Sequence, residues 1–490
     1  MAEIIQLLTV ENTTNRKRQP TEQTLVFHIL IASLTYHKCV EVCWCGEDGR
    51  WQTLAAKFLL GCGEKQEYWQ AKLTVRTLNG SALPGNIQFA LRLRCQQQEY
   101  WDNNHGVNFI SVANSGIRLD KHRILQNLNF STQLLDKQQW LRIQVAVQTS
   151  FAAEKVNVHW TNDGWQHDHH TACRLNKRLS NAETQIWTAR IKLGATFRLH
   201  YAISCKHQQL LVWDNNKGKN YTVSHAPLTV LILNLHCYQE DQQDHKFSQI
   251  AKAIQEQNVD VVCLQEVAEF WNQGYGDWAT NAANIINQRL QQPYHLYTDW
   301  SHIGFDKYRE GVAILSRYPM FNQQSRYVSE SHDIYNIHSR KVVMAQMTVP
   351  YMGDMTIFSA HLSWWEDGFQ QQFERLCSWA DSLNQPLRNT TLLCGDFNIT
   401  FGSQGYREVV NTQSYQDQYL AANAQGLFAQ IYRVNDSHWQ HQFAEDYRID
   451  YIFMHKHSVW RVSSAKVLFT EQDYGRVSDH CGYIMTFEPK

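Results

Sequence analysis

An internal repeat in the first half of the chain constrains the fold more than any other feature of the sequence. Residues 100–109 read Tyr-Trp-Asp-Asn-Asn-His-Gly-Val-Asn-Phe, and residues 212–221 read Val-Trp-Asp-Asn-Asn-Lys-Gly-Lys-Asn-Tyr. Other tryptophan-containing segments recur in the same order about 115 residues later. The paired landmarks are Trp44, Trp69 and Trp101 in the first copy and Trp160, Trp187 and Trp213 in the second. A constant order at a nearly constant spacing predicts a duplicated domain.

Short alternating strands, separated by turns rich in Asn, Asp and Gly, surround these landmarks. This pattern is typical of β-sandwiches. We therefore predict one sandwich over residues 20–115 and a second over residues 139–225. The charged stretch at 116–138, rich in Gln and Leu, is interpreted as a linker with one short helix.

Each copy of the repeat closes with a polar turn that suits contact with a sugar. A tryptophan ring stacks on the apolar face of glucose, and Asn amides offer a donor and an acceptor to vicinal hydroxyls. The Trp-Asp-Asn-Asn-x-Gly-x-Asn pattern resembles the starch- and glycogen-binding modules of carbohydrate-binding family 21. The candidate sugar-binding residues are Trp101, Asn103, Asn104 and Asn108 in the first copy and Trp213, Asn215, Asn216 and Asn220 in the second. For the four tryptophans upstream of these turns, core packing is favoured over sugar contact.

The composition excludes several classes of protein. The 490 residues include 45 basic and 46 acidic side chains, a formal charge of −1, which disfavours binding to long nucleic acids. No apolar run approaches 18 residues and no signal-peptide pattern opens the chain, so we expect neither a membrane span nor secretion. The 12 cysteines are scattered, several inside apolar runs, which favours buried free thiols and a cytoplasmic location.

The sequence pattern changes after a hinge at residues 224–227. Residues 228–235 and 259–266 are apolar runs that predict buried strands, and residues 247–257 between them show helical periodicity. Helices on both faces of buried strands predict an α/β layered domain over residues 226–490.

Polar residues recur at the ends of the apolar strands in this C-terminal half. They are Asn234, Glu266, His361, Asp396 with Asn398, Asp450, and Asp479 with His480. Carboxylates and amides at strand ends converge on one edge of a sheet, where a hard cation and a phosphate can be held. Two alternatives stay open: Asp450 as a structural ion pair with Arg448, and Asn234 as a cap of its strand.

In this order, the polar residues resemble the motifs of the endonuclease/exonuclease/phosphatase superfamily, which includes deoxyribonuclease I and inositol-polyphosphate phosphatases. The resemblance covers residues 228–490 and implies an α/β four-layer sandwich. The whole chain is then multidomain, with two N-terminal β-sandwiches ahead of a deoxyribonuclease I-like domain. It also implies Mg²⁺, or Mn²⁺, held by Asn234, Glu266 and Asp479, whose ligand atoms are all oxygens.

The same resemblance implies a role for each remaining polar residue. His480 matches the general base, or electrostatic partner, of the attacking water, and Asp450 matches the carboxylate that orients its imidazole. Asp396 and Asn398 match residues that position the water and the phosphate oxygens, and His361 matches a hydrogen-bond donor to phosphate. Because phosphoryl transfer depends mainly on positioning and charge stabilisation, no protein nucleophile is required.

Further segments resemble the maltose 6′-phosphate phosphatases of bacteria, a sugar-phosphatase branch of this superfamily. They include residues 299–306, 310–317 and 361–369. The resemblance implies hydrolysis of a phosphorylated malto-oligosaccharide or α-glucan. The candidate substrate-binding residues are Trp364, Trp365, His302 and Arg340. Core packing remains the alternative for the tryptophan pair.

Three other functions stay open on the sequence. One is a nuclease that associates with glycogen, which the neutral charge disfavours. Another is a phosphodiesterase or phosphatase acting on inositol phosphates or phospholipids. The last is a non-enzymatic glucan-binding scaffold, which the complete set of strand-end residues disfavours.

Overall fold

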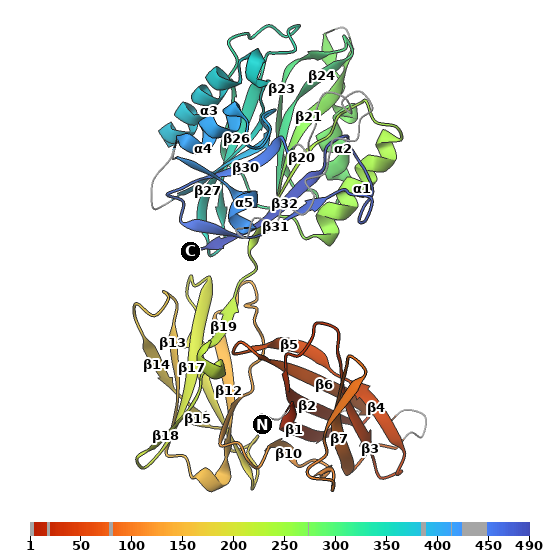
Figure 1. Cartoon of the computed structure of the whole chain (residues 1–490), viewed down its shortest axis with the longest axis vertical. Helices are drawn as coiled ribbons and strands as arrows, with labels where there is room; N and C mark the ends of the chain where they lie inside the picture. The colour runs from red at the N-terminus through yellow and green to blue at the C-terminus, as the bar shows by residue number, and fades with distance from the viewer. Residues whose placement is uncertain are drawn as a thin grey trace. The chain divides into compact units, whose positions relative to one another are not determined.

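The computed structural model describes residues 4–16, 20–77, 82–272, 274–383, 389–412, 414–423 and 448–490. The chain divides into two compact units, Met1–Ala226 and Pro227–Lys490 (Figure 1). Strands predominate in both, and the α-helices of the described residues lie in the second unit. No helix in the described part of the chain is long and apolar enough to cross a membrane.

The first unit contains two β-sandwiches of similar topology. In the first sandwich, one sheet has the order β10-β1-β2-β6-β5 and the other has the order β4-β3-β7-β8, with β9 on β7. Its strands are β1 (Ile5–Asn15), β2 (Glu22–Ala32), β3 (Cys39–Cys45), β4 (Trp51–Ala55), β5 (Lys57–Cys62), β6 (Gln66–Arg76), β7 (Ile87–Cys95), β8 (Gln98–Asp102), β9 (Phe109–Ser111) and β10 (Gly116–Leu119).

The second sandwich repeats this order, as β11-β12-β16-β15 and β14-β13-β17-β18 with β19 on β17, except that its first sheet has no strand equivalent to β10. The sequence repeat is therefore a structural duplication. Its elements are β11 (Leu125–Asn127), β12 (Trp140–Gln148), η1 (Thr149–Phe151), β13 (Lys155–Thr161), β14 (His169–Ala172), β15 (Arg174–Leu175), β16 (Thr184–Lys192), β17 (Arg198–His207), β18 (Leu210–Asp214), η2 (Asn216–Gly218) and β19 (Tyr221–Ser224).

The structure differs from the predicted limits of the sandwiches. Strand β1 precedes residue 20, and the segment 116–138 holds strands β10 and β11 instead of a helix-containing linker. The aspartate of each repeated motif explains why these strands belong to the sandwiches. The Leu7 backbone N–H donates to Asp102 Oδ2 over 3.0 Å, and the Asn127 N–H donates to Asp214 Oδ2 over 2.7 Å. Each aspartate thus fixes the first strand of its own module.

The two sandwiches share part of a core inside the first unit. Leu30 and Tyr68 of the first sandwich belong to the same buried cluster as Val158 of the second. The hydroxyls of Tyr68 and Tyr221 lie 3.2 Å apart. The two modules are therefore held together by buried contacts, in addition to the chain that joins them.

The second unit is built on two sheets. Their orders are β23-β24-β21-β20-β32-β31, with β22 on β21, and β25-β26-β27-β28-β30-β29. The strands are β20 (Leu228–Asn234), β21 (Val261–Asn272), β22 (Tyr275–Gly276), β23 (His295–Gly304), β24 (Tyr308–Ser316), β25 (Phe321–Tyr327), β26 (Lys341–Val349), β27 (Gly353–His361), β28 (Asn389–Asp396), β29 (Tyr415–Asp417), β30 (Asp450–His455), β31 (Trp460–Leu468) and β32 (Gly482–Pro489).

Helices pack against these two sheets, which themselves meet through strands such as β21 and β27 (Figure 1). The helical segments are α1 (Gln243–Glu256), η3 (Trp278–Thr280), α2 (Ala282–Gln288), η4 (Trp365–Asp367), α3 (Phe369–Leu383), α4 (Gln404–Asn411) and α5 (Gln418–Ala422). Helix α1 turns Phe247, Ile250 and Ile254, spaced by three or four residues, into the core of the first sheet. Helix α3 does the same against the second sheet through Phe373 and Leu376.

Candidate functional site

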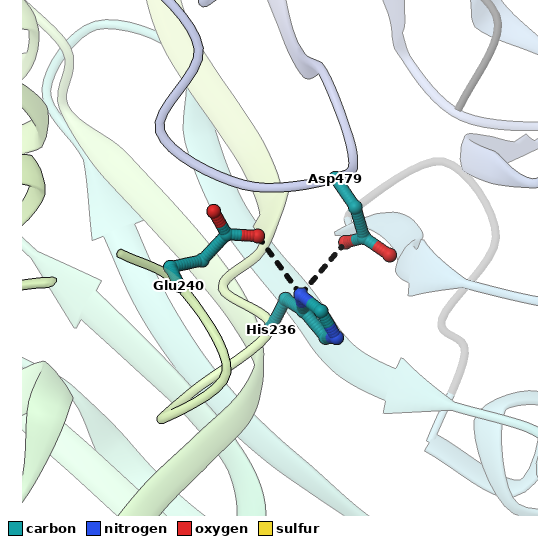
Figure 2. A group of neighbouring side chains, drawn as sticks. All are labelled: His236, Glu240 and Asp479. Atoms are coloured by element: carbon teal, nitrogen blue, oxygen red, sulfur yellow. Dashed lines mark hydrogen bonds and ion pairs between the residues drawn. The ribbon is translucent and has the colours of Figure 1, made fainter. Parts of the chain in front are cut away.

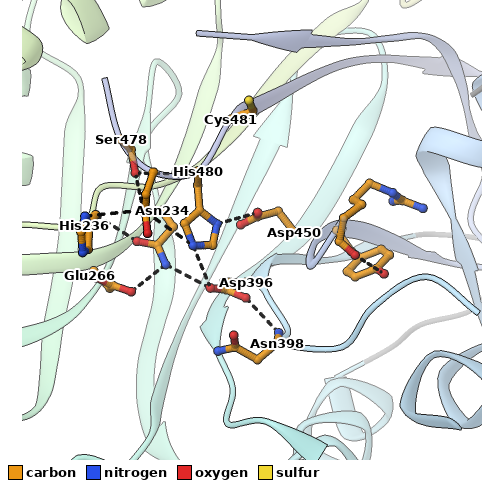
Figure 3. Close-up of polar contacts among 12 residues, drawn as sticks. Asn234, His236, Glu266, Asp396, Asn398, Asp450, Ser478, His480 and Cys481 are labelled. Atoms are coloured by element: carbon orange, nitrogen blue, oxygen red, sulfur yellow. Dashed lines mark hydrogen bonds and ion pairs between the residues drawn. The ribbon is translucent and has the colours of Figure 1, made fainter. Parts of the chain in front are cut away.

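The polar residues at the strand ends meet at one edge of the second unit (Figure 3). Asn234 ends β20, His361 ends β27 and Asp396 ends β28, while Asp450 begins β30. His361 is the register partner of Asp396, and Asp396 is the register partner of Asp450. Three neighbouring strands thus bring these side chains to the same level of the second sheet.

Asn234 links the two sheets. Its Nδ2 donates to Glu266 Oε1 over 2.8 Å and to Asp396 Oδ2 over 3.0 Å, and its Oδ1 accepts from the His236 backbone N–H over 3.1 Å. Asn234 itself is fully buried. Its amide therefore orients two carboxylates of the site and is more than a cap of its strand.

His480 forms a buried pair with Asp450. The distance from His480 Nδ1 to Asp450 Oδ2 is 2.8 Å, and His480 Nε2 lies 3.8 Å from Asp396 Oδ2 and 3.9 Å from Asp479 Oδ1. Burial lowers the pKa of His480, but the charges of Asp450, Asp396 and Asp479 outweigh burial and raise it well above its usual value. The ion pair of Asp450 with Arg448 is not observed, because the Arg448 guanidinium binds Asp417.

His361 faces the same carboxylates from the other side. Its Nε2 lies 3.7 Å from Asp396 Oδ2 and 4.0 Å from Glu266 Oε1, and Arg340 Nη1 lies 3.4 Å from its Nδ1. Burial, followed by the positive charge of Arg340, holds the pKa of His361 well below its usual value, so the ring is neutral. Because a guanidinium only donates, Nδ1 accepts, and the ring proton sits on Nε2, toward the carboxylates.

Unusual backbone conformations bring the functional side chains together. Glu266 (φ +49°) lies where the pairing of β21 with β24 is irregular, and Asn398 has φ +51°. The Asn398 N–H donates to Asp396 Oδ1 over 2.9 Å, and its Nδ2 donates to Leu362 O over 2.8 Å. Gly395 has φ +135°, and a Cβ there would lie 2.0 Å from the Ala360 carbonyl oxygen. A side chain at residue 395 would therefore force β28 away from β27.

The carboxylates of the site repel one another in the absence of a cation. Burial, followed by the nearby Glu310 carboxylate, raises the pKa of Glu266 to about 7. Burial, followed by Asp450, raises the pKa of Asp396 to about 7 as well. Ligand atoms of Glu266, His361 and Asp396 all lie within 4.8 Å of one another. The carboxylate oxygens of this group, beside the His361 nitrogen, fit a hard divalent cation, whose charge would stabilise the ionised carboxylates. The expected ligand Asp479 lies in a neighbouring group with His236 and Glu240.

Sequence reasoning missed three residues beside this centre. His236 Nδ1 lies 2.8 Å from Glu240 Oε1 and 3.6 Å from Asp479 Oδ1 (Figure 2). Glu310 pairs with His302 across β23 and β24, with 3.4 Å between Oε1 and His302 Nε2. Two of them could have been found from the sequence. His236 follows the end of a predicted strand by two residues, and Glu310 lies in the segment 310–317 that resembles the sugar phosphatases.

The predicted substrate-binding residues take different positions. Arg340 and His302 lie beside His361, as its pKa shows through their charges. Trp365 packs against the hydrophobic core of the second sheet, with its ring 6.1 Å from that of Phe369. This is the core packing that the sequence left open as the alternative to substrate binding. Trp364 is half-buried.

In the second sandwich, the repeated motif borders a surface hollow. Trp213, which is 47% exposed, lines it together with Asn215 and Asn220. Asn216 was expected to contact sugar, but it is buried, and its amide donates to the Asn220 carbonyl over 3.1 Å. Asn216 therefore shapes the loop instead of facing a ligand.

The first sandwich has a similar hollow beside Trp101, which is 46% exposed, lined also by Asn103 and Asn104. The Asn104 amide donates to the Asn108 carbonyl over 3.1 Å, the contact that Asn216 makes in the second copy. The upstream Trp44 is buried in the core, as favoured from the sequence.

Comparison with known families matches the second unit and the second sandwich. The model of the Endonuclease/Exonuclease/phosphatase family matches residues 232–480, and the model of the carbohydrate/starch-binding module (family 21) matches residues 120–224. The second match begins inside the predicted linker, in agreement with the position of β11. No curated protein matches the chain.

Solved structures similar to the chain cover its second half. A family member from Leptotrichia buccalis is 26% identical, with a TM-score of 0.46, over 53% of this chain and 99% of that one. A mannosyl-6-phosphatase from Bacteroides thetaiotaomicron is 16% identical, with a TM-score of 0.41, over 53% and 99%. The human Nocturnin catalytic domain is 18% identical, with a TM-score of 0.41, over 54% and 94%.

Proposed function

Because the chain belongs to the endonuclease/exonuclease/phosphatase family, we propose that its second unit is a metal-dependent phosphatase that acts on phosphorylated malto-oligosaccharides or α-glucans such as glycogen and starch. The reaction is hydrolysis of a phosphate monoester by direct attack of water. The observation that carries the proposal is the buried Asp450–His480 pair, set beside Asp396, Asn234 and Glu266 at the end of both sheets.

Asn234, Glu266 and Asp479 hold Mg²⁺, or Mn²⁺, in this proposal. Their donor atoms are oxygens, and the raised pKa of Glu266 marks a carboxylate that a cation would stabilise. When bound, the cation would neutralise phosphate charge, polarise the P–O bond and offset the carboxylate charges that raise the pKa of His480.

His480 and Asp396 activate and orient the water. The Asp450 carboxylate accepts the Nδ1 proton of His480 at 2.8 Å, which leaves Nε2 to receive a proton from the water. Asp396 Oδ2 lies 3.8 Å from that Nε2, a separation that one bridging water would fill. The water oxygen then bonds to phosphorus while the bond from phosphorus to the sugar oxygen breaks, and the sugar oxygen takes up a proton from solvent and leaves as a hydroxyl.

In this proposal, neutral and cationic hydrogen-bond donors bind the phosphate on the side away from His480. His361 presents its Nε2 proton, and Arg340, beside it, supplies a positive charge. The Asn398 amide is fixed through one N–H by Leu362 O and keeps a second N–H for a phosphate oxygen. These groups stabilise charge without forming a bond to phosphorus.

The sugar part of the proposal rests on the first unit. Residues 120–224 match a carbohydrate/starch-binding module, and the exposed Trp213 lies in a hollow with two Asn side chains. A module that binds polymer raises the local concentration of phosphate esters carried by that polymer. A phosphatase joined to such a module should therefore act most efficiently on phosphate esters carried by α-glucan.

A substrate panel with Mg²⁺ tests the proposal. It compares maltose 6′-phosphate, glucose 6-phosphate, phosphorylated glycogen, duplex and single-stranded DNA, and inositol phosphates. We expect the highest kcat/KM on the phosphorylated glucans, measured as released phosphate. Faster cleavage of DNA or of an inositol phosphate would replace the assigned substrate, while leaving the metal-dependent chemistry in place.

Loss of the exposed tryptophans should separate docking from catalysis. The double substitution Trp101→Ala with Trp213→Ala removes both stacking faces, so binding to glycogen should weaken by about tenfold or more. Turnover of a small soluble phosphate ester should stay within about twofold, since neither residue lies in the second unit. Co-sedimentation with glycogen measures the binding.

Trp140→Ala is the matched control, because this tryptophan is equally exposed, at 51%, and opens β12 away from the hollow. Circular dichroism establishes that each variant is folded. Equal binding by the folded double variant and the parent would show that the repeated motifs do not hold sugar.

A further inference from the structure

Three aromatic side chains form a cluster in the second unit that the proposed chemistry does not use. The rings of Tyr238 and Phe270 are stacked, with centroids 5.5 Å apart. Tyr308 lies 5.4 Å from Tyr238 and 5.3 Å from Phe270. Phe270 is 40% exposed, and the two tyrosines are half-buried. Both tyrosines pack against the hydrophobic core of the first sheet, so Phe270 is the most exposed ring of the cluster.

Two separate segments lead from the candidate site to this cluster. Tyr238 lies two residues beyond His236, whose imidazole is 3.6 Å from Asp479. Tyr308 lies two residues before Glu310, whose charge acts on Glu266. Two residues span at most about 7 Å, both in strand β24 and in the loop after β20 that holds Tyr238. The cluster is thus adjacent to the phosphate site along each of these segments.

The strand register extends the aromatic surface outward from the site. Cα partners across an antiparallel pair share a face, and the partners here run from Ala268 with Glu310 to Phe270 with Tyr308. On β22, Tyr275 is the partner of Asn272, two residues beyond Phe270, and is 79% exposed. One face of the sheet therefore carries a carboxylate, then two aromatic rings, then an amide and a third ring.

We propose that this stripe, formed by Tyr238, Phe270, Tyr308, Asn272 and Tyr275, binds the glucosyl units next to the phosphorylated sugar. The assignment rests on the proposed function. Aromatic faces stack on the apolar faces of glucose, and an exposed Asn amide offers both a donor and an acceptor to its hydroxyls. The enzyme then recognises the chain that carries the phosphate as well as the phosphate itself.

The position of Arg309, one of the two cations next to Tyr308 along with the exposed Lys307, favours a neutral sugar over single-stranded nucleic acid. Bases also stack on aromatic rings, but nucleic-acid grooves add cations that bind the phosphates. Arg309 alternates with Tyr308 and Glu310 and so points to the opposite face. There its guanidinium pairs with Glu269 and lies 5.3 Å from the centre of the Trp300 ring. It is therefore occupied away from the stripe.

Kinetics of Phe270→Ala test the stripe on the full chain. On a phosphorylated malto-oligosaccharide of four or more units, kcat/KM should fall by about tenfold, mainly through KM. On glucose 6-phosphate it should change by less than about twofold, because one sugar does not reach the stripe. Phe321→Ala is the control, since Phe321 is 47% exposed but lies on β25 of the other sheet. Equal losses on both substrates, or no loss on the longer one, would overturn the proposal.

Hydrogen exchange provides a readout that needs no turnover, so the stripe can be judged even when the substrate proposal fails. Unphosphorylated maltoheptaose should slow exchange in residues 267–272 and 274–276 of the parent and not in Phe270→Ala. Absence of this protection in the parent refutes the sugar site. Protection by oligothymidylate, without protection by maltoheptaose, would assign the stripe to nucleic acid instead.

Discussion

Replacing His480 with alanine should lower kcat by about 10²- to 10⁴-fold, the usual loss on removing a positioned general acid or base. The imidazole is held by Asp450 at 2.8 Å, and its Nε2 faces Asp396 and Asp479. Among the described residues, His480 is the imidazole that lies within hydrogen-bond distance of the Asp450 carboxylate. KM should change little, since the loss concerns proton transfer and not ground-state binding. Initial rates of phosphate release measure both constants.

His455→Ala provides the matched control for this variant. His455 is as buried as His480, at 9%, and lies at the other end of β30 from Asp450. A loss of turnover in both variants would indicate a damaged sheet. Near-parental turnover in folded His480→Ala would remove the imidazole from the mechanism and leave charge stabilisation as the main contribution.

The sequence was sufficient to predict the architecture of the first unit, because tryptophan landmarks and turn residues recur with the period of a whole module. It was less informative at the boundaries. Strands β1, β10 and β11 join their sheets through distant partners, such as the Asn127 N–H that donates to Asp214. A local pattern of charged and polar residues does not reveal a bond to a residue 87 positions away. The linker prediction failed for that reason.

The polar edge of the candidate site was predictable to the extent that strand ends are recognisable. A polar residue directly after an apolar run marks a strand end, and Asn234, His361 and Asp396 were found this way. Glu310 was missed because it lies near the start of its strand, where no apolar run ends. It is placed beside the site by the pairing of β23 with β24, which sets it opposite His302. Asn216 was misjudged because an amide in a turn binds either a ligand or its own backbone, and only the structure distinguishes these.

Removing divalent cations should abolish turnover entirely, and Mg²⁺ or Mn²⁺ should restore it better than Zn²⁺. The reason is the donor set, since Asn234, Glu266 and Asp479 offer oxygens without a thiolate. Glu266→Gln should keep the hydrogen bond from Asn234 but lose a negative charge, and so weaken Mg²⁺ binding. Asp354→Asn is the control, because this exposed carboxylate lies at the opposite end of β27 from His361. Full activity after exhaustive chelation would show that the centre works without a metal.

The affinity for Mg²⁺ should also depend on pH in a predictable direction. Burial and Glu310 raise the pKa of Glu266 to about 7, so the metal-free carboxyl is protonated below that pH and ionised above it. Mg²⁺ binds the ionised form, so binding releases a proton at low pH. The contribution of Glu266 to the affinity should therefore fall by about tenfold for each pH unit below 7 and level off above about pH 8. Isothermal titration in two buffers of different ionisation enthalpy measures the proton release.

The variant Glu266→Gln is the control for this prediction. Its amide does not titrate, so the contribution of residue 266 to the pH dependence should disappear, while the contribution of Asp396 remains. An equal dependence in the variant and the parent would mean that Glu266 is not the group displaced by the cation.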